Sequence, residues 1–311
     1  MILTVCPHTA LDKILFIDEW IPGTPMRTDK IINSVGGKAL DSAVVFSQLG
    51  VQSVGLGFFA GKTGQELLDL VNEYGIEGVP VWVDGENRIA HVIAERKNNR
   101  HSHVIAGKVL ISDKQKKEFV EKYRQYLSDA EWVIFAGSLP PDINPDFYFE
   151  LIQIAHEQGV PSLIDSQKQY MVEAIRAQPE IVKMNWEEFE WTFGLNAENL
   201  DSLIELAKTF HKERDLKNLV LTLSKEGILA ITREGNFLAK APFQKPVNAA
   251  GAGDAVSSTL VWRLLKGESW ETAMKWAGAV SAAAVLTERT GDVHQEDIDR
   301  IFPDVSVKRI S

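Results

Sequence analysis

The segment from Asn248 to Ala255 combines small residues with one carboxylate, directly before an apolar helical stretch. Gly251 and Gly253, separated by Ala252, let the backbone approach a ligand closely, and a helix that begins here points unpaired N–H groups at the same place. The helix dipole adds partial positive charge, so this turn can stabilise a phosphate or a transferring phosphoryl group. Asp254 stands beside it and can accept the proton of an attacking hydroxyl. A plain glycine turn with an acidic capping residue is the alternative.

A second glycine pair, Gly36 and Gly37, also precedes a helical stretch and is followed by Lys38 and Asp41. The glycines let a polyhydroxylated ligand approach the backbone, and the two charged side chains can hold its oxygens. The alternative is a glycine-rich helix entry with solvated charges. The pattern therefore predicts a second ligand-binding element when other binding motifs occur in the same chain.

Asp12 follows Ala10-Leu11, and we expect it at the end of the first strand. A carboxylate there can accept two hydroxyl hydrogen bonds, although it can also be an ordinary surface aspartate. A phosphorylated ligand would need basic residues on the side away from this carboxylate. Arg88 and Arg100 are the candidates for this role, with Arg27 as a third, because guanidinium groups bind phosphate through two hydrogen bonds.

The tripeptide Gly61-Lys62-Thr63 suggests a P-loop, because a strand precedes it and a helix follows. A P-loop has four residues between its two glycines. Three residues separate Gly57 from Gly61, and five separate Gly55 from Gly61. The position that would give four is Leu56. We therefore interpret this tripeptide as a turn between a strand and a helix.

Four motifs together resemble the signatures of the ribokinase-like (phosphofructokinase-B) carbohydrate kinases. In chain order they are Gly36-Gly37-Lys38, Gly137-Ser138-Leu139-Pro140-Pro141, Lys183-Met184-Asn185-Trp186-Glu187-Glu188 and the Gly-Ala-Gly-Asp turn at 251–254. The resemblance spans nearly the whole chain. Leu3-Thr4-Val5 and Ala10-Leu11-Asp12 are most similar to the branch that includes 1-phosphofructokinase and tagatose-6-phosphate kinase. Ala39 and Asp41 depart from the commoner Gly-Gly-Lys-Gly-x-Asn pattern.

The resemblance implies an ATP-dependent kinase that phosphorylates a hydroxyl of a sugar or sugar phosphate, with a fructose-phosphate-like substrate favoured. It implies that Asn185 and Glu188 hold the water shell of Mg²⁺, although this spacing also fits a helix capping box, and both can be true. It assigns the remaining candidates to the nucleotide site (Lys183, Ser224 and Gly227) and to substrate binding (Ser138). The alternatives are a kinase for a nucleoside or vitamin alcohol, for which Trp20 and Trp82 could stack, and a catalytically silent sugar-binding regulator.

Composition excludes several other classes of protein. The 311 residues carry a net charge of −10, which is the wrong sign for binding nucleic acid. The single cysteine, Cys6, lies in an apolar run, cannot form an intrachain disulfide and indicates a reducing compartment. We expect the N-terminal apolar run to be a first strand and not a signal peptide, and the longest weakly polar stretch, from Trp276 to Leu286, is far short of a membrane span. We therefore expect a cytoplasmic protein with no membrane or nucleic-acid partner.

Strand-like runs alternate with helical patterns along the chain, for example Ser53–Phe58 before Thr63–Tyr74 and Trp132–Phe135 before Asn144–Gln158. This alternation predicts one α/β domain over residues 1–311, which the resemblance specifies as a ribokinase-like three-layer αβα sandwich with a mostly parallel sheet. The segments 13–34 and 88–105 do not fit the alternation. The resemblance implies that they form a small β-sheet lid over the sugar, and we expect this lid to join two copies in a homodimer. A lid that closes only over its own domain is the alternative.

Overall fold

A large, mostly parallel sheet forms the centre of the computed structural model, which describes residues 1–98 and 100–310. The strands from β12 to β5 are parallel, and antiparallel strands extend both edges. In spatial order the strands are β15 (Ser306–Ile310), β14 (Gly235–Lys240), β13 (Ile228–Thr232), β12 (Asn218–Thr222), β11 (Ile181–Asn185), β10 (Ser162–Asp165), β9 (Trp132–Ala136), β1 (Ile2–Cys6), β4 (Ser53–Ala60), β5 (Glu77–Gly85) and β8 (Val109–Leu110).

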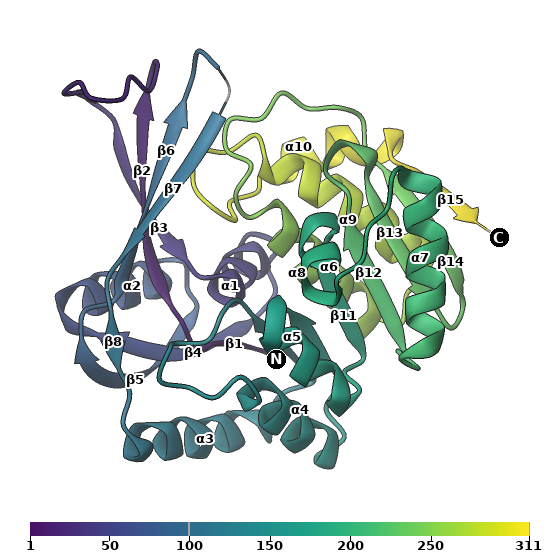
Figure 1. The fold of residues 1–311 in the computed structure, drawn as a ribbon, viewed down its shortest axis with the longest axis horizontal. Helices are drawn as coiled ribbons and strands as arrows, with labels where there is room; N and C mark the ends of the chain where they lie inside the picture. The colour runs from purple at the N-terminus through teal and green to yellow at the C-terminus, as the bar shows by residue number, and fades with distance from the viewer. Residues whose placement is uncertain (99, 311) are drawn as a thin grey trace.

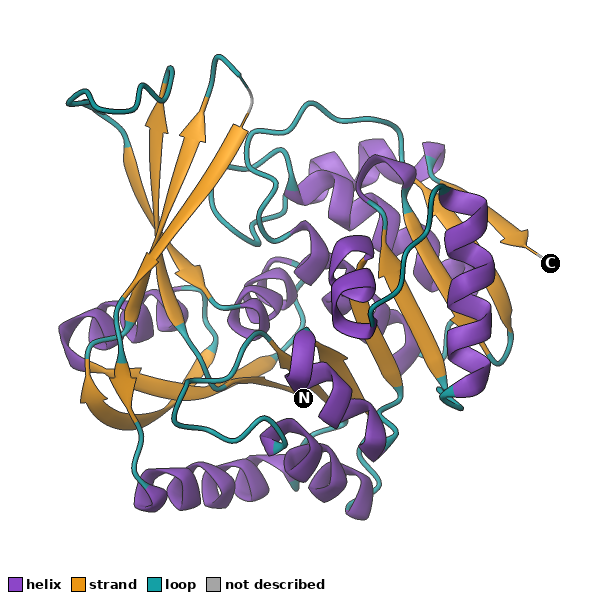
Figure 2. Cartoon of the chain, in the orientation of Figure 1, coloured by secondary structure: helices purple, strands orange, loops and turns teal. Residues whose placement is uncertain are grey.

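Helices cover both faces of this sheet (Figures 1 and 2). One face packs against α3 (Asp113–Leu127), α4 (Phe147–Glu157), α5 (Lys168–Ala174), α6 (Trp186–Phe193) and α7 (Leu200–Glu213). The other packs against α1 (Lys38–Gln48), α2 (Gly61–Glu73), α8 (Ala252–Leu265) and α9 (Trp270–Ala284), with α10 (Gln295–Ile301) against α9. The predicted three-layer αβα architecture is confirmed. None of the described helices is long and apolar enough to cross a bilayer.

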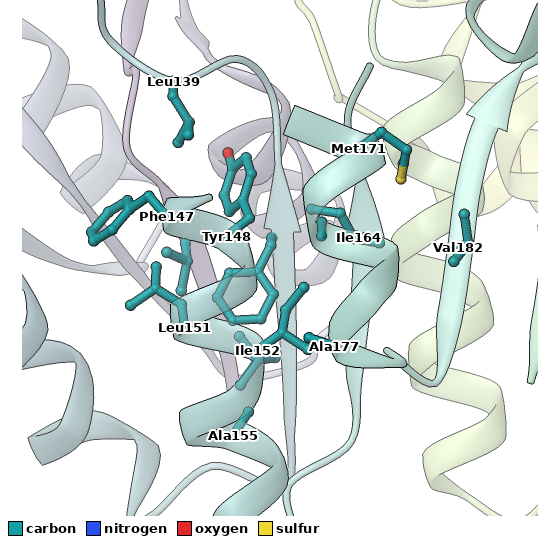
Figure 3. Packing of buried hydrophobic residues seen from close by; sticks show 14 of the residues in the cluster. Leu139, Phe147, Tyr148, Leu151, Ile152, Ala155, Ile164, Met171, Ala177 and Val182 are labelled. Atoms are coloured by element: carbon teal, nitrogen blue, oxygen red, sulfur yellow. The ribbon is translucent and has the colours of Figure 1, made fainter. Parts of the chain in front are cut away.

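The central strands are buried on both faces, so their sequences are continuous apolar runs rather than alternating ones. Figure 3 shows Phe147, Tyr148 and Leu151 of α4 packed beside Ile164 of β10 and Met171 of α5. The Tyr148 hydroxyl donates hydrogen bonds to the carbonyls of Ala136 (3.1 Å) and Gly137 (3.2 Å). This contact ties the core to the turn after β9, which is where site residues begin.

A second, smaller sheet projects from the body (Figure 1), as expected for the lid. Its strands, in order, are β3 (Ile31–Gly36), β2 (Ala10–Ile17), β6 (Arg88–Glu95) and β7 (Arg100–Ala106). The β2–β3 and β6–β7 pairs are antiparallel, and β2 and β6 are parallel. One expectation was wrong, because Asp12 lies inside β2 of the lid and not at the end of β1. The chain turns directly from β1 into the lid, which places this carboxylate on the lid itself.

Candidate active site

The glycine turn before α8 forms one wall of the site. Gly251 is the N-cap of the helix at φ = +85°, and a Cβ on it would lie 2.4 Å from the backbone nitrogen of Gly291. A Cβ on Gly253 would lie 2.8 Å from Lys183 Nζ, so a side chain there would displace that ammonium group. Asn248 Oδ1 accepts a hydrogen bond from the backbone of Ala250 and fixes the turn. The first N–H groups of α8 have no partner inside the helix and can bind an anion.

Asp254, in the first turn of α8, has the properties of a proton acceptor. Its side chain is only 7% exposed, and its Oδ1 has no hydrogen-bond partner among the described residues. Burial raises the pKa of Asp254 to about 7, with a further rise from Asp165, while the ammonium groups of Lys183 and Lys38 oppose this shift. A carboxylate with a pKa near neutrality and a free oxygen can take the proton of a bound hydroxyl.

Asp165 joins two lysines beneath this aspartate. Its Oδ1 accepts a hydrogen bond from Lys38 Nζ (2.9 Å) and its Oδ2 accepts one from Lys183 Nζ (2.7 Å). Lys38 also donates to Glu188 Oε1 at 2.9 Å. Despite burial, the two lysines hold the pKa of Asp165 below its usual value, and Asp165 and Glu188 raise the pKa of Lys38. Asp165 and Lys38 are therefore charged.

The sequence analysis did not identify Asp165, and it predicted other contacts for Lys38 than the structure shows. Lys38 was expected to hold oxygens of the ligand beside Asp41, but its ammonium points at Asp165 and Glu188, within electrostatic reach of Asp254. The available signal for Asp165 was its place at the carboxyl end of a buried strand, where ligand sites of parallel sheets occur.

Asn185 and Glu188 form the capping box of α6. Asn185 Oδ1 accepts a hydrogen bond from the backbone of Glu188 (2.7 Å), and Glu188 Oε2 accepts one from the backbone of Asn185 (3.0 Å). The capping interpretation is thereby confirmed. Among the described residues, no group of three or more His, Cys, Asp or Glu side chains is placed to hold a metal ion. The carboxylate of Glu188 and the amide of Asn185 are oxygen-bearing groups, which fits contact with the water shell of a Mg²⁺ ion.

Asp12 and Asp41 converge from the lid and from α1. Asp12 Oδ2 accepts a hydrogen bond from the Thr290 hydroxyl (3.1 Å), and burial raises the pKa of Asp12 to about 7. Asp41 is 5% exposed, and its Oδ1 has no partner within the described chain. A Cβ on Gly36 would lie 2.1 Å from Asp12 Oδ1, and Gly37 has φ = +104°, so glycine is required at both positions.

Arg88 supplies positive charge next to these carboxylates. Its Nη2 donates to the carbonyl of His8 (2.6 Å), while its interactions with Asp12 and Asp41 are electrostatic. His8 Nδ1 lies 3.0 Å from Ser138 Oγ, and burial lowers the pKa of His8 to about 3, so this imidazole is neutral. Arg88 and Ser138 thus both contact His8, and their roles in substrate binding stay predictions.

Arg100 lies at the other end of the lid sheet. The strand register pairs Arg100 with Glu95, seven residues along β6 from Arg88. Its guanidinium bonds both carboxylate oxygens of Glu95 at 2.9 Å and is 64% exposed. The structure does not bring Arg100 to Asp12 or Asp254 within one chain.

An open cleft of about 1050 Å³ leads to the glycine turn. Ser224 and Gly227 line this cleft, and Ala252 and Gly253 line it where it meets the glycine turn. Gly227 has φ = +109°, and a Cβ there would lie 2.0 Å from the carbonyl oxygen of Ala239. The cleft is as large as a small-molecule site and joins an apolar wall to an anion-binding turn, which suits a nucleotide.

The Gly61-Lys62-Thr63 turn is already closed by an acidic side chain. The carboxylate of Glu86 accepts hydrogen bonds from the backbone N–H groups of Lys62 (3.3 Å) and Thr63 (3.1 Å). A Cβ on Gly61 would collide with the same carboxylate. The N-terminus of α2 therefore binds an anion of the protein itself, and the P-loop interpretation is rejected.

Lys62→Ala is accordingly expected to leave kcat and the KM for nucleotide within about twofold of wild type. A lysine that contacts the β- and γ-phosphates would instead cause a severe loss on removal. Steady-state kinetics with the purified variant check this. A collapse of turnover in a folded Lys62→Ala protein would place the nucleotide at α2.

Comparisons with known proteins agree with this geometry. The model of the pfkB family carbohydrate kinases matches residues 8–297. A tagatose-6-phosphate kinase of Staphylococcus epidermidis is 24% identical over 99% of both chains, and a 1-phosphofructokinase of Bacillus subtilis is 25% identical over 100% of both. The solved structure of a possible 1-phosphofructokinase from Thermotoga maritima superposes with a TM-score of 0.90 at 25% identity, covering 100% of this chain and 99% of the other.

The fold type is supported by a more distant structure. Ribokinase from Arabidopsis thaliana, solved with ribose and ATP, superposes with a TM-score of 0.76 at 15% identity, covering 97% of this chain and 98% of the other. The expected ribokinase-like fold is confirmed. The chain belongs to the pfkB family of carbohydrate kinases, enzymes that transfer a phosphoryl group to an alcohol.

Proposed function

We propose that this enzyme transfers the γ-phosphoryl group of ATP to a hydroxyl of a phosphorylated ketohexose, a fructose-phosphate-like acceptor. The observation that carries the proposal is Asp254, whose buried Oδ1 has no partner among the described residues and lies beside a glycine turn with free N–H groups. The cleft that ends at this turn accommodates the nucleotide. The pfkB family match and the kinases of sugar phosphates among the relatives support the same assignment.

In the proposed reaction the acceptor hydroxyl forms a bond to the γ-phosphorus as the bond from that phosphorus to the bridging oxygen of ADP breaks. The hydroxyl proton passes to Asp254 late in a loose transition state. Backbone N–H groups of the turn at Gly251, Ala252 and Gly253 stabilise the charge on the equatorial oxygens. The ammonium groups of Lys38 and Lys183 offset the charge of Asp165, which would otherwise oppose the approach of ATP.

Mg²⁺ is part of the proposal, because it neutralises ATP phosphates during phosphoryl transfer. Glu188 and Asn185 would contact its water shell at the N-terminus of α6. The carboxylate of Glu188 is held from two sides, by Lys38 and by the backbone of Asn185, so it is rigidly placed for this task.

On the acceptor side, Asp12 and Asp41 would accept hydroxyl hydrogen bonds, and Gly36 and Gly37 would let the sugar reach the backbone. Arg88 is the proposed contact for an acceptor phosphate, because its guanidinium lies next to both carboxylates. Neither Trp20 nor Trp82 has a described contact with this cluster; Trp82 packs on Phe59 with ring centroids 6.2 Å apart. This arrangement favours a sugar phosphate over an acceptor with an aromatic ring.

The direct test measures ADP release with MgATP and a panel of acceptors. The panel contains fructose 1-phosphate, fructose 6-phosphate, tagatose 6-phosphate, free fructose and a nucleoside. We expect one of the ketohexose phosphates to give the highest kcat/KM. Turnover of the nucleoside alone would support the aromatic-acceptor alternative, and sugar binding in a thermal-shift assay without any turnover would indicate a silent regulator.

We also propose a cytoplasmic homodimer joined through the lids. ATP and sugar phosphates are cytoplasmic metabolites, which supports the location. The edge strand β7 exposes Val104 (55%) and Ile105 (56%), and edge strand β3 exposes Ile31 (57%). Exposed apolar residues on sheet edges favour pairing with another chain.

Light scattering at micromolar concentration is expected to give twice the chain mass of 34.7 kDa. Val104→Lys combined with Ile105→Lys should shift the protein to monomer, because buried lysines at an interface lose hydration. Leu110→Lys, at another exposed apolar position in β8, is the matched control. A wild-type mass of 34.7 kDa that substrates do not change would leave the lid as a monomeric flap.

A further inference from the structure

The side chain of Asp41 lies among more carboxylates than the nearby cations can balance. It is 5% exposed, and its Oδ1 finds no hydrogen-bond donor in the part of the chain that the structure describes. The packed elements β3, β4 and β9 contribute no charged residue near it. The titratable and charged groups that act on it, from β1, β2, α1, β6 and α8, are Cys6, Asp12, Lys38, Arg88 and Asp254.

The two cations in this set are already engaged. Lys38 Nζ donates to Asp165 and to Glu188, both at 2.9 Å. Arg88 donates through Nη2 to the carbonyl of His8 at 2.6 Å and through Nε to the carbonyl of Thr9 at 3.4 Å. Arg88 donates to neutral carbonyls, so its charge acts on Asp12 and Asp41, while Lys38 and Lys183 act on Asp254 as well as on Asp165. Like charges in a buried site cannot all ionise together, so protons remain bound.

The three carboxylates differ in how they are held. Asp12 Oδ2 accepts the Thr290 hydroxyl, which suits an ionised carboxylate. Asp254 lies beside the lysine pair and must be ionised to accept a proton. Burial raises the pKa of Asp41 well above its ordinary value, and the neighbouring Asp254 and Asp12 raise it further. Asp41 Oδ1 has no donor among the described residues, and the cations that act on it, Arg88 and Lys38, act on other carboxylates as well.

We propose that Asp41 enters the reaction as a neutral carboxylic acid and donates a hydrogen bond to an oxygen of the acceptor. This inference rests on the proposed kinase function. A neutral Asp41 can act as donor and acceptor at once, whereas an ionised carboxylate can only accept. Protonation of Asp41 also removes one negative charge from the surroundings of Asp254 and from the path of the incoming phosphoryl group. Asp41 thereby positions the acceptor while Asp254 remains the group that takes its proton.

The role predicts a bell-shaped dependence of kcat/KM on pH. Activity rises as Asp254 ionises and falls as Asp41 ionises, because the second ionisation removes the donor and adds a charge. Asp41→Ala should lower kcat/KM for the acceptor by about tenfold or more, mainly through KM, since one buried hydrogen bond is lost. Asp41→Asn should recover most of this loss and should lack the alkaline decline, because an amide stays neutral at every pH.

A second readout does not depend on turnover. Asp12 and Asp254, with pKa values of about 7, contribute carboxylic acid bands at neutral pH. In infrared difference spectra of the free enzyme, the carbonyl band of protonated Asp41 should persist at pH 8, where those two are largely ionised, and Asp41→Asn should remove it. Asp12→Asn is the matched control, and it should leave that band in place. If no acceptor is phosphorylated, the proposed function fails while this spectrum still tests Asp41.

Four results would overturn the inference. One is a folded Asp41→Asn enzyme as impaired as Asp41→Ala, which would mean that the negative charge itself is needed. Another is an alkaline limb that persists in Asp41→Asn. The third is the absence of an Asp41-dependent carboxylic acid band at pH 8. A preference of the wild type for an amino sugar over the matching hydroxyl sugar would also contradict it, because an ionised Asp41 favours a cation.

Discussion

Asp254→Asn is expected to lower kcat by about 10²–10⁴-fold, the usual contribution of a positioned acid–base group. The KM values for ATP and acceptor should change by only a few fold, because an amide keeps the shape of the carboxylate. Rapid-quench or coupled-assay kinetics measure both quantities. A variant that keeps more than about a third of wild-type turnover would exclude Asp254 as the proton acceptor, since that is far outside this range.

The same substitution should stabilise the protein at alkaline pH. Burial holds the folded-state pKa of Asp254 at about 7, above its ordinary value of 3.8, so the folded form binds a proton that the unfolded chain has already lost. The free energy of unfolding therefore falls as pH rises between these values and stays low above them. Asp254→Asn should gain about 1–4 kcal/mol at pH 8 and much less at pH 4. Asp129→Asn, at an exposed position, is the control and should change neither stability nor kcat.

Asp165→Ala is expected to cost about 3–5 kcal/mol of stability, because it leaves the buried Lys183 without its ion-pair partner and Lys38 with Glu188 alone. The KM for ATP should change as well, since both ammonium groups would lose this partner. Urea unfolding followed by fluorescence measures the stability. Glu118→Ala, which breaks a surface ion pair with Lys122, should cost less than about 1 kcal/mol. Equal costs for the two variants would show that Asp165 contributes no more than a surface charge.

Local signals predicted the parts of the site that one segment builds alone. The glycine turn at 251–254 and the capping box of Asn185 and Glu188 are each contained in a few residues, and their geometry follows from backbone rules. The alternation of strands and helices likewise predicted the αβα layers. These features depend on interactions between residues that are close in the chain, so the sequence alone is enough to predict them.

The remaining parts arise from segments that meet only in the folded chain. Asp165 is adjacent to Lys183 because β10 and β11 pair in parallel with residues 165 and 183 in register. Thr290 reaches Asp12 from 278 positions away, and nothing in its own surroundings marks it. The position of Arg100 depends on the β6–β7 register, which pairs it with Glu95. Sequence patterns can mark such residues as candidates, but they do not predict which of them lie in contact in the folded chain.

The close contact between Gly251 and Gly291 has a consequence for how the protein is made. Gly291 packs against the backbone of Gly251 on one side and near the carbonyl of Asp41 on the other, so three distant segments share one point. Contacts this far apart in sequence form late, because each closes a long loop. A growing chain on the ribosome therefore cannot complete its catalytic centre until residue 291 has been made. Nascent chains that stop before residue 291 should be folded in part and unable to transfer phosphate.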